Sequence, residues 1–313
     1  MPRAIKKSAT TPERDILKLI AAADHRPQSA TRRIGIHTST AGGVETSAER
    51  AWRLGCNTLQ IFSSSPRMWR PYDITPAQCE AMARLRASYD LKPLVIHANY
   101  LINVAGTNPE ILEKSISAFR AELERAISLS AEYVVLHPGS FRGCSREEGI
   151  ANACAAIVRA TDGLHMADHN LTLLIENTAG AEFSLGSSFE SVAELIAALA
   201  KHIPVASCID TCHTHVKGYD IVSQSGYEET MQKLDATVGL PNVRVWHCND
   251  AKAACGSKLD RHENIGKGSI GAEPFRRLLH DPRHAHAAFI LETPIDEPLD
   301  DLHNVEELKE LAG

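Results

Sequence analysis

Aromatic residues and long apolar runs are both scarce in this chain of 313 residues. Aromatic side chains make up 5% of it, and its longest apolar stretches are shorter than a dozen residues. A membrane-spanning helix needs about 20 apolar residues in succession, and no apolar signal-peptide core follows the N-terminus. We therefore expect a soluble, cytoplasmic protein that makes no contact with membranes. Its hydrophobic content of 43% is still sufficient for a large core.

A compact cysteine pattern and a glycine-rich phosphate loop are also missing. The eight cysteines are scattered, which argues against a disulfide framework and favours reduced, buried thiols. Cys208 and Cys212 could be read as a zinc pair, but alternate residues of an extended run point in opposite directions. No glycine-rich loop follows the first apolar run, and this disfavours an open doubly wound sheet, the alternative to a barrel.

The chain also lacks the positive charge that is typical of proteins that bind polyanions. Its formal net charge is −6, but three bound divalent ions would supply a compensating +6. Nucleic acid is therefore not excluded, and a local positive face would suffice. Basic residues lie in the same predicted loops as the candidate ligands, and some of them can equally be ordinary solvated charges: Arg67, Arg70, Lys252, Lys258, Arg261 and Lys267.

Residues 1–33 differ in composition from the rest of the chain. They carry eight Lys or Arg against three Asp or Glu, with one amphipathic stretch over residues 16–23. We predict a basic, flexible extension with a short helix, followed by a single catalytic domain over residues 34–313. A DNA-contacting arm and a targeting sequence are the alternatives for this extension.

What the chain does contain is a regular alternation of short apolar runs and helical patterns. Leu112, Ile116, Phe119 and Leu123 show the helical period well. Regular alternation of strand and helix predicts parallel strands, and eight such units close into a (β/α)8 TIM barrel. The predicted strands are residues 34–37, 58–62, 94–97, 133–137, 171–176, 205–210, 243–247 and 288–292.

Seven of these eight runs end in His, Glu or Asp. Side chains at the carboxyl ends of barrel strands point into the mouth where barrel enzymes carry out their chemistry. A loop of more than twenty residues, 249–271, adds further candidates. Five imidazoles and four carboxylates are too many for one tetrahedral zinc and suit two or three ions that share a bridging carboxylate. The candidate ligands are His97, His137, Glu176, Asp210, His213, His247, Asp260, His262 and Glu292.

The remaining histidines are not placed in this site. We interpret His37, which also ends a strand, as a supporting group beside the ligands. The others lack the strand-end position and are expected at the surface: His25, His165, His169, His202, His215, His280, His284, His286 and His303.

Several strings of the sequence resemble the endonuclease IV family of apurinic/apyrimidinic endonucleases. They occur in the family's order across residues 34–293: HANYLIN (97–103), LHPGS (136–140), IENTAG (175–180), CIDTCH (208–213), GYD (218–220), HCNDAK (247–252), LDRHENIGKGSIG (259–271) and LET (291–293). The resemblance implies a zinc-dependent phosphodiesterase of base-excision repair. Such an enzyme cuts duplex DNA on the 5′ side of an abasic site, leaves a 3′ hydroxyl and trims blocked 3′ ends.

The resemblance also implies three zinc ions, with manganese possible at one position. His97, His137 and Glu176 would bind the first ion, and Glu176 would bridge to the second. The second ion would also have Asp210, His247 and Glu292, and the third would have His213, Asp260 and His262. Glu176, as the ligand that holds the attacking hydroxide, and Glu292 would be the catalytic carboxylates.

By the same resemblance, damaged DNA would be bent and side chains wedged into the gap left by the flipped nucleotide. Arg67, Tyr100 and Leu101 occupy the matching positions. Met68 stands where the bacterial pattern has Gln, so the resemblance implies no contact to the opposite base at this position. The basic extension over residues 1–33 is also absent from the bacterial pattern. The sequence shows no interface signal, and we expect a monomer.

Two other function classes fit parts of the sequence. A sugar isomerase or epimerase on a related barrel also uses strand-end His, Glu and Asp with divalent metal, but it needs one or two ions and a small closed pocket. A damage-binding protein without catalysis predicts a broken ligand set. Nine intact candidates together with basic loops favour the endonuclease.

Overall fold

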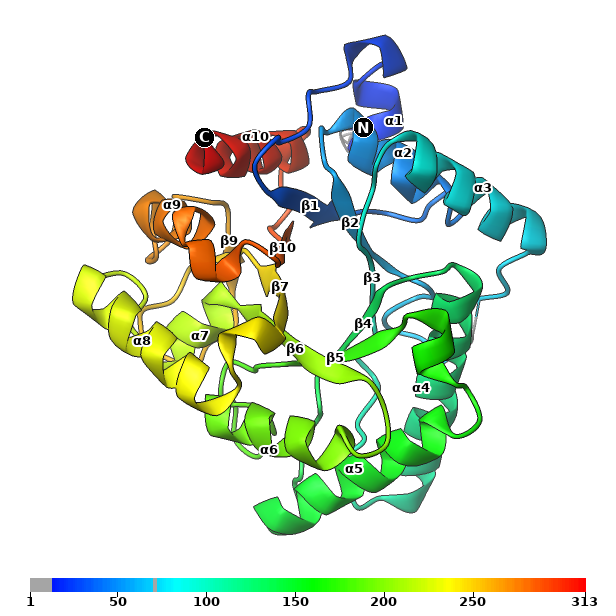
Figure 1. Cartoon of the computed structure of the whole chain (residues 1–313), viewed down its shortest axis with the longest axis vertical. Helices are drawn as coiled ribbons and strands as arrows, with labels where there is room; N and C mark the ends of the chain where they lie inside the picture. Colours follow the sequence, from blue (N-terminus) through cyan, green and yellow to red (C-terminus); the bar gives the residue numbers. More distant parts are fainter. Residues whose placement is uncertain (1–12, 70–71) are drawn as a thin grey trace, which may run out of the picture.

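The computed structural model describes residues 13–69 and 72–313, and it contains a closed barrel of eight parallel strands (Figure 1). Their order around the barrel is β1-β10-β7-β6-β5-β4-β3-β2. The predicted TIM barrel is confirmed, and every predicted strand agrees with an observed one to within one residue at each end. The strands are β1 Arg33–His37, β2 Thr58–Phe62, β3 Leu94–His97, β4 Tyr133–Leu136, β5 Thr172–Glu176, β6 Val205–Asp210, β7 Val243–His247 and β10 Ala288–Leu291.

Helices surround this barrel as an outer ring (Figure 1). Polar caps mark where several of them begin: Thr75 and Ser145 each accept a backbone N–H bond from the third helical residue. The helices are α1 Ile16–Leu19, α2 Thr46–Arg53, α3 Pro76–Ser88, α4 Pro109–Ser128, α5 Arg146–Thr161, α6 Phe189–Leu199, α7 Thr211–Lys217, α8 Gln224–Thr237, α9 Ala272–His280 and α10 Asp300–Ala312. Short 3-10 turns lie at Ala22–Asp24, Met166–His169, Leu240–Asn242 and Pro282–His284. No helix in the described part of the chain has the length and apolar character needed to cross a membrane.

The strand residues alternate between the interior of the barrel and the layer under the helices. Phe119 and Leu123 of α4 are buried in that outer layer, as the helical period predicts. The interior holds a separate cluster: Val95, Val135, Leu174, Ala206, Cys208, Val245, Ala288 and Ile290. Because side chains have a period of two along a strand, the next inward position on six of these strands is its carboxyl end. Those six positions are predicted ligands: His97, His137, Glu176, Asp210, His247 and Glu292.

Residues 13–32 pack against the barrel rather than extending away from it. Ile16 in α1 and Ile20, the residue directly after this helix, are buried against the core. Arg50 of α2 lies 3.0 Å from Asp15, and Arg53 donates to the carbonyl oxygens of Leu17 and Ile20 at 2.9 and 2.6 Å. The expectation of a flexible extension therefore does not describe this part. Residues 1–12 lie outside the described residues, and the domain boundary at residue 34 stays a prediction.

Candidate metal centre

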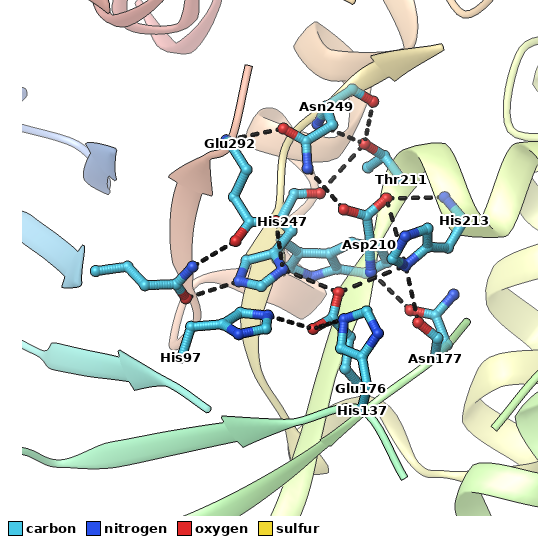
Figure 2. A network of polar contacts seen from close by, with 12 residues as sticks. His97, His137, Glu176, Asn177, Asp210, Thr211, His213, His247, Asn249 and Glu292 are labelled. Atoms are coloured by element: carbon cyan, nitrogen blue, oxygen red, sulfur yellow. Dashed lines mark hydrogen bonds and ion pairs between the residues drawn. The ribbon is translucent and has the colours of Figure 1, made fainter. Parts of the chain in front are cut away.

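The nine predicted ligands converge on one mouth of the barrel. Figure 2 shows His97, His137, Asp210, His247 and Glu292 around Glu176. Glu176 is fully buried, and its carboxylate lies within 3.4 Å of four imidazoles. Its Oε2 lies 3.3 Å from His97 Nε2 and 2.9 Å from His137 Nε2. Glu176 is therefore the centre of the cluster.

Two groups of potential ligand atoms share Glu176. His97, His137 and Glu176 form one, and Glu176, Asp210, His247 and Glu292 form the other. Within each group the ligand atoms all lie within 4.8 Å of one another. These are the groupings that the family resemblance implies for the first two ions.

A third group lies where α7 meets the long loop after β7. Asp210, His213 and His262 come within the same 4.8 Å limit. The exposed Asp260 reaches this group from the loop, with its oxygens 3.2 Å from His213 Nε2 and 3.3 Å from His262 Nε2. Asp210 also accepts the backbone N–H of His213 at 2.8 Å, so this strand-end carboxylate caps α7 and fixes where His213 points.

Three imidazoles are anchored through Nδ1 to backbone carbonyl oxygens. His97 Nδ1 lies 2.8 Å from the Ala98 carbonyl, His213 Nδ1 lies 2.9 Å from that of Asn177, and His262 Nδ1 lies 3.0 Å from that of Glu292. A carbonyl oxygen only accepts, so Nδ1 donates and Nε2 presents its lone pair. In all three, Nε2 faces the carboxylates of the cluster.

The cluster as a whole is short of positive charge. It holds four carboxylates in a largely buried space, and Glu176 Oε2 and His262 Nε2 are buried without a well-formed hydrogen bond. Burial opposes ionisation of Glu176, yet His137 and His247 hold the pKa of its carboxyl well below the usual range. Burial likewise opposes protonation of His262, but the hydrogen bond to Asp260 and the charge of Asp210 raise its pKa to about 9. The same carboxylates that favour a protonated imidazole would favour a divalent cation held between them, with the neutral imidazoles as ligands.

Two buried cysteines lie beside these groups: Cys208 is close to Glu176 and His247, and Cys212 is close to Asp260 and His262. All eight are free thiols. Cys208 lies beneath Glu176 and His247 within reach of both, but burial raises the pKa of its thiol to about 12. Burial also raises the pKa of Cys212. The three groups described above each contain at least three His, Asp or Glu side chains without a thiol.

Two amides that were not among the predicted site residues connect the candidate ligands by hydrogen bonds. Asn177 accepts the backbone N–H of Asp210 at 2.7 Å. Asn249 donates to Asp210 Oδ2 at 2.6 Å and accepts the backbone N–H of Glu292 at 2.8 Å. Both asparagines stand within two residues after a strand-end ligand, and that position was the signal available in the sequence.

The predicted surface location of the remaining histidines is wrong for two of them. His215 is 3% exposed, and its Nε2 lies 3.1 Å from Ser269 Oγ. His284 is fully buried with its ring edge against Trp246. Both lie outside strand ends, where the sequence pattern carries no signal of burial. The other seven are exposed.

Asp250 organises the long loop that carries Asp260 and His262. Its buried carboxylate accepts four backbone N–H groups, from Ala251, Gly268, Ile270 and Gly271, at 2.7–3.2 Å. A Cβ on Gly268 would stand 2.4 Å from Asp250 Oδ1, so this close approach requires glycine. The short antiparallel pair β8 Asp250–Ala251 and β9 His262–Glu263 completes the loop. The predicted functional loop is therefore a folded structure, in which one buried carboxylate accepts four backbone N–H groups.

Asp250→Asn is expected to lower the free energy of unfolding by about 2–4 kcal/mol, because an amide nitrogen would face buried N–H donors left without an acceptor. Urea unfolding measures this change, and limited proteolysis reports whether the loop over residues 252–271 opens first. Asp235→Asn is the matched control, since the exposed Asp235 accepts one backbone N–H. Equal unfolding curves for both variants would contradict the role of Asp250.

Tyr100, one of the predicted DNA-contacting residues, borders the cluster. Tyr100 is 57% exposed, and its ring packs edge-on against Phe62 and His97, with centroids 5.2 and 5.4 Å away. Leu101 beside it is half-buried, and Arg67 is exposed on the loop after β2. Of the predicted basic residues in these loops, Lys252, Lys258, Arg261 and Lys267 are exposed, whereas Arg70 lies outside the described residues.

Asn99 joins the two loops that carry Arg67 and Tyr100. Its Nδ2 donates to the carbonyl oxygens of Ser65 and Met68 at 2.9 and 2.8 Å. Its Oδ1 accepts the backbone N–H of Leu101 at 2.7 Å. One buried amide thus holds both loops in a common arrangement beside the metal-capable groups.

Comparison with known proteins supports the same family. The family model described as a xylose isomerase-like TIM barrel matches residues 48–312. A probable endonuclease 4 from Solibacter usitatus is 50% identical over 284 residues, which cover 90% of this chain and 97% of the relative. The crystal structure of endonuclease IV from Thermus thermophilus superposes with a TM-score of 0.78 at 38% identity, and the match covers 89% of this chain and 98% of that one.

Sugar-modifying barrels are more distant. A D-tagatose 3-epimerase-like protein superposes with a TM-score of 0.62 at 20% identity, over 89% of this chain and 96% of that one, and this shows a shared fold alone. Near-complete coverage at 50% identity decides between the two classes. On the strength of these sequence relatives and of the matching structure, the chain belongs to the endonuclease IV family of apurinic/apyrimidinic endonucleases.

Proposed function

We propose that this protein is a metal-dependent endonuclease that hydrolyses the phosphodiester on the 5′ side of abasic sites in duplex DNA, and that it trims blocked 3′ ends. Water adds to phosphorus, the bond to the 3′ oxygen breaks, and that oxygen leaves as a 3′ hydroxyl. The observation that carries the proposal is the convergence of nine His, Asp and Glu side chains beside exposed aromatic and basic loops. A DNA substrate implies work inside the cell, and we take the single chain as the acting unit.

Three zinc ions are the proposed occupants, with manganese as an alternative at one position because His and carboxylate sets accept both. His97 and His137 would hold the first, with Glu176 shared. Glu176, Asp210, His247 and Glu292 would hold the second, and His213, Asp260 and His262 the third. When bound, such ions supply activation of water and neutralisation of charge on the phosphate. Glu176 and Glu292 are the proposed catalytic carboxylates.

The chain's own residues would orient the substrate around this centre. The face of Tyr100 and the side chain of Leu101 offer apolar contact to an unstacked base step, and Arg67 offers a charged contact from the facing loop. Lys252, Lys258, Arg261 and Lys267 can pair with backbone phosphates, which gives affinity without sequence preference. The abasic nucleotide, which has lost its base, is the one that costs least to extrude.

A duplex oligonucleotide with one stable abasic analogue tests the function. Purified protein is expected to cut this strand once, on the 5′ side of the analogue, and to leave the matched intact duplex whole. The length of the labelled product and its extension by a polymerase establish the 3′ hydroxyl. Metal-loaded protein that leaves the abasic strand uncut would overturn the proposal.

Asn99→Ala is expected to raise KM for the abasic duplex about 10-fold with a smaller change in kcat, because each lost hydrogen bond contributes about 1 kcal/mol to holding the two loops. Steady-state kinetics separate the two constants. Asn108→Ala is the control, since Asn108 caps α4 with one comparable hydrogen bond at 3.1 Å. An unchanged KM in Asn99→Ala would show that the loops hold their arrangement without this amide.

A further inference from the structure

Gln60 of β2 is a fully buried amide at the level of the apolar barrel interior. It pairs in register with Val95 of β3, two positions before His97. At that level the strands that carry the cluster contribute Val95, Val135, Leu174, Cys208, Val245 and Ile290. A buried amide costs free energy unless its hydrogen bonds are satisfied. The hydrogen-bond partners of Gln60 therefore indicate its structural role.

The orientation of the Gln60 carboxamide follows from those partners. One end lies 2.6 Å from Glu292 Oε1 and 3.0 Å from His37 Nδ1. A carboxylate oxygen only accepts, so this end is the NH2 group, which donates to Glu292 and to the lone pair of His37. The other end is then the oxygen, and it lies 2.8 Å from His247 Nε2. An amide oxygen only accepts, so His247 carries a proton on Nε2.

This assignment makes His247 the reverse of the other anchored imidazoles. His97, His213 and His262 donate through Nδ1 to backbone carbonyl oxygens and present Nε2. His247 donates through Nε2 and presents Nδ1, which lies 3.1 Å from Glu176 Oε1 and 3.3 Å from Glu292 Oε2. The hydrogen-bond acceptor for the His247 ring is therefore the side chain of Gln60, whereas the acceptor for each of the other three rings is a backbone carbonyl oxygen.

We propose that Gln60 is a positioning residue for the second group, which contains Glu176, Asp210, His247 and Glu292. It holds His247 in the tautomer whose Nδ1 lone pair would face the ion, and it orients Glu292 through its NH2 group. Hydrogen bonds of this kind fix the ring orientation and basicity of a metal-ligating histidine. Gln60 acts on two ligands of the same group at once. The inference rests on the proposed metal centre and is independent of the identity of the substrate.

Gln60→Met tests the role, because it keeps the side-chain volume and removes all three hydrogen bonds, to Glu292, His37 and His247. Removing such a partner costs about 10- to 100-fold in metal affinity, so the variant should release zinc at a correspondingly lower chelator concentration. Elemental analysis after dialysis against graded chelator measures this. Gln28→Met is the matched control, since Gln28 also donates two hydrogen bonds, to the carbonyl oxygens of Cys56 and Tyr89, away from the site.

Ring-nitrogen NMR of zinc-loaded wild type provides a second readout. His247 is expected as the Nε2–H tautomer, with His97, His213 and His262 as Nδ1–H tautomers. An Nδ1–H His247, or equal zinc retention by Gln60→Met and wild type, would overturn the role of Gln60. If Gln60→Met does not fold by circular dichroism, Gln60→Leu replaces it in the same titration. Wild type that retains no metal would instead contradict the proposed centre.

Discussion

The Glu176→Gln protein is expected to incise an abasic duplex at least about 1,000-fold more slowly than wild type, equivalent to about 4 kcal/mol of lost transition-state stabilisation. Glu176 is the only residue shared by the first two ligand groups, and its two oxygens face imidazoles on both sides. An amide keeps the shape but replaces one oxygen with a donor, which cannot bind a cation. Single-turnover incision together with metal content measures the effect, and bound metal should fall with the rate.

A matched carboxylate separates this effect from general destabilisation. Glu132 pairs with Arg86 at 2.6 Å and accepts the backbone N–H of Leu94 at 2.7 Å, outside the metal-capable groups. Glu132→Gln should lose some stability and keep its metal and its incision rate. A Glu176→Gln protein as active as wild type would remove the shared carboxylate from the mechanism.

Removal of metal is the second change with a large expected effect. Chelator-treated protein should lose its incision activity and unfold at a lower temperature. An ion whose free concentration is about 1,000 times its dissociation constant adds about 4 kcal/mol to the free energy of unfolding. For a chain of this size, that corresponds to a fall in Tm of the order of 8 °C. Without cations, the four carboxylates of the cluster must be balanced by protonated imidazoles at a cost in desolvation. Differential scanning calorimetry before and after treatment measures the change.

Reloading distinguishes metal loss from irreversible damage. Zinc added to the stripped protein should restore both Tm and incision, whereas magnesium, which prefers oxygen ligands, should restore little. Asp260→Ala offers a graded comparison, since it removes one ligand of the third group from an exposed position. Stripped protein with unchanged Tm and full incision would contradict a metal centre.

The positions of the candidate ligands could be predicted because strand ends are visible in sequence. A short Val- and Leu-rich run followed by His, Glu or Asp marks a carboxyl end, and parallel strands bring all such ends to one mouth. Six of the nine candidates follow from this rule alone, and the structure brings them together with Asp260, His213 and His262. The period of two explains why the apolar residue two positions earlier lies inside the barrel.

The supporting residues could not be predicted in the same way. Gln60 lies in the middle of a strand, and only the register of β2 beside β1 and β3 brings it under Glu292 and His247. Asp250 depends on the path of the loop that returns to it at Gly268 and Gly271. The packing of Ile16 and Ile20 against α2 and the core likewise depends on where the N-terminal segment runs.

The sequence by itself determined the barrel, the ligand types and the family, because hydrophobic period, strand-end residues and motif order are properties of the chain read in line. The tertiary structure alone decided which ring nitrogen four of the imidazoles present and which amides hold the candidate ligands. Those features depend on contacts of about 3 Å between residues up to 232 positions apart. Local preferences for helix or strand cannot indicate such contacts, because the contacts form only when the barrel closes.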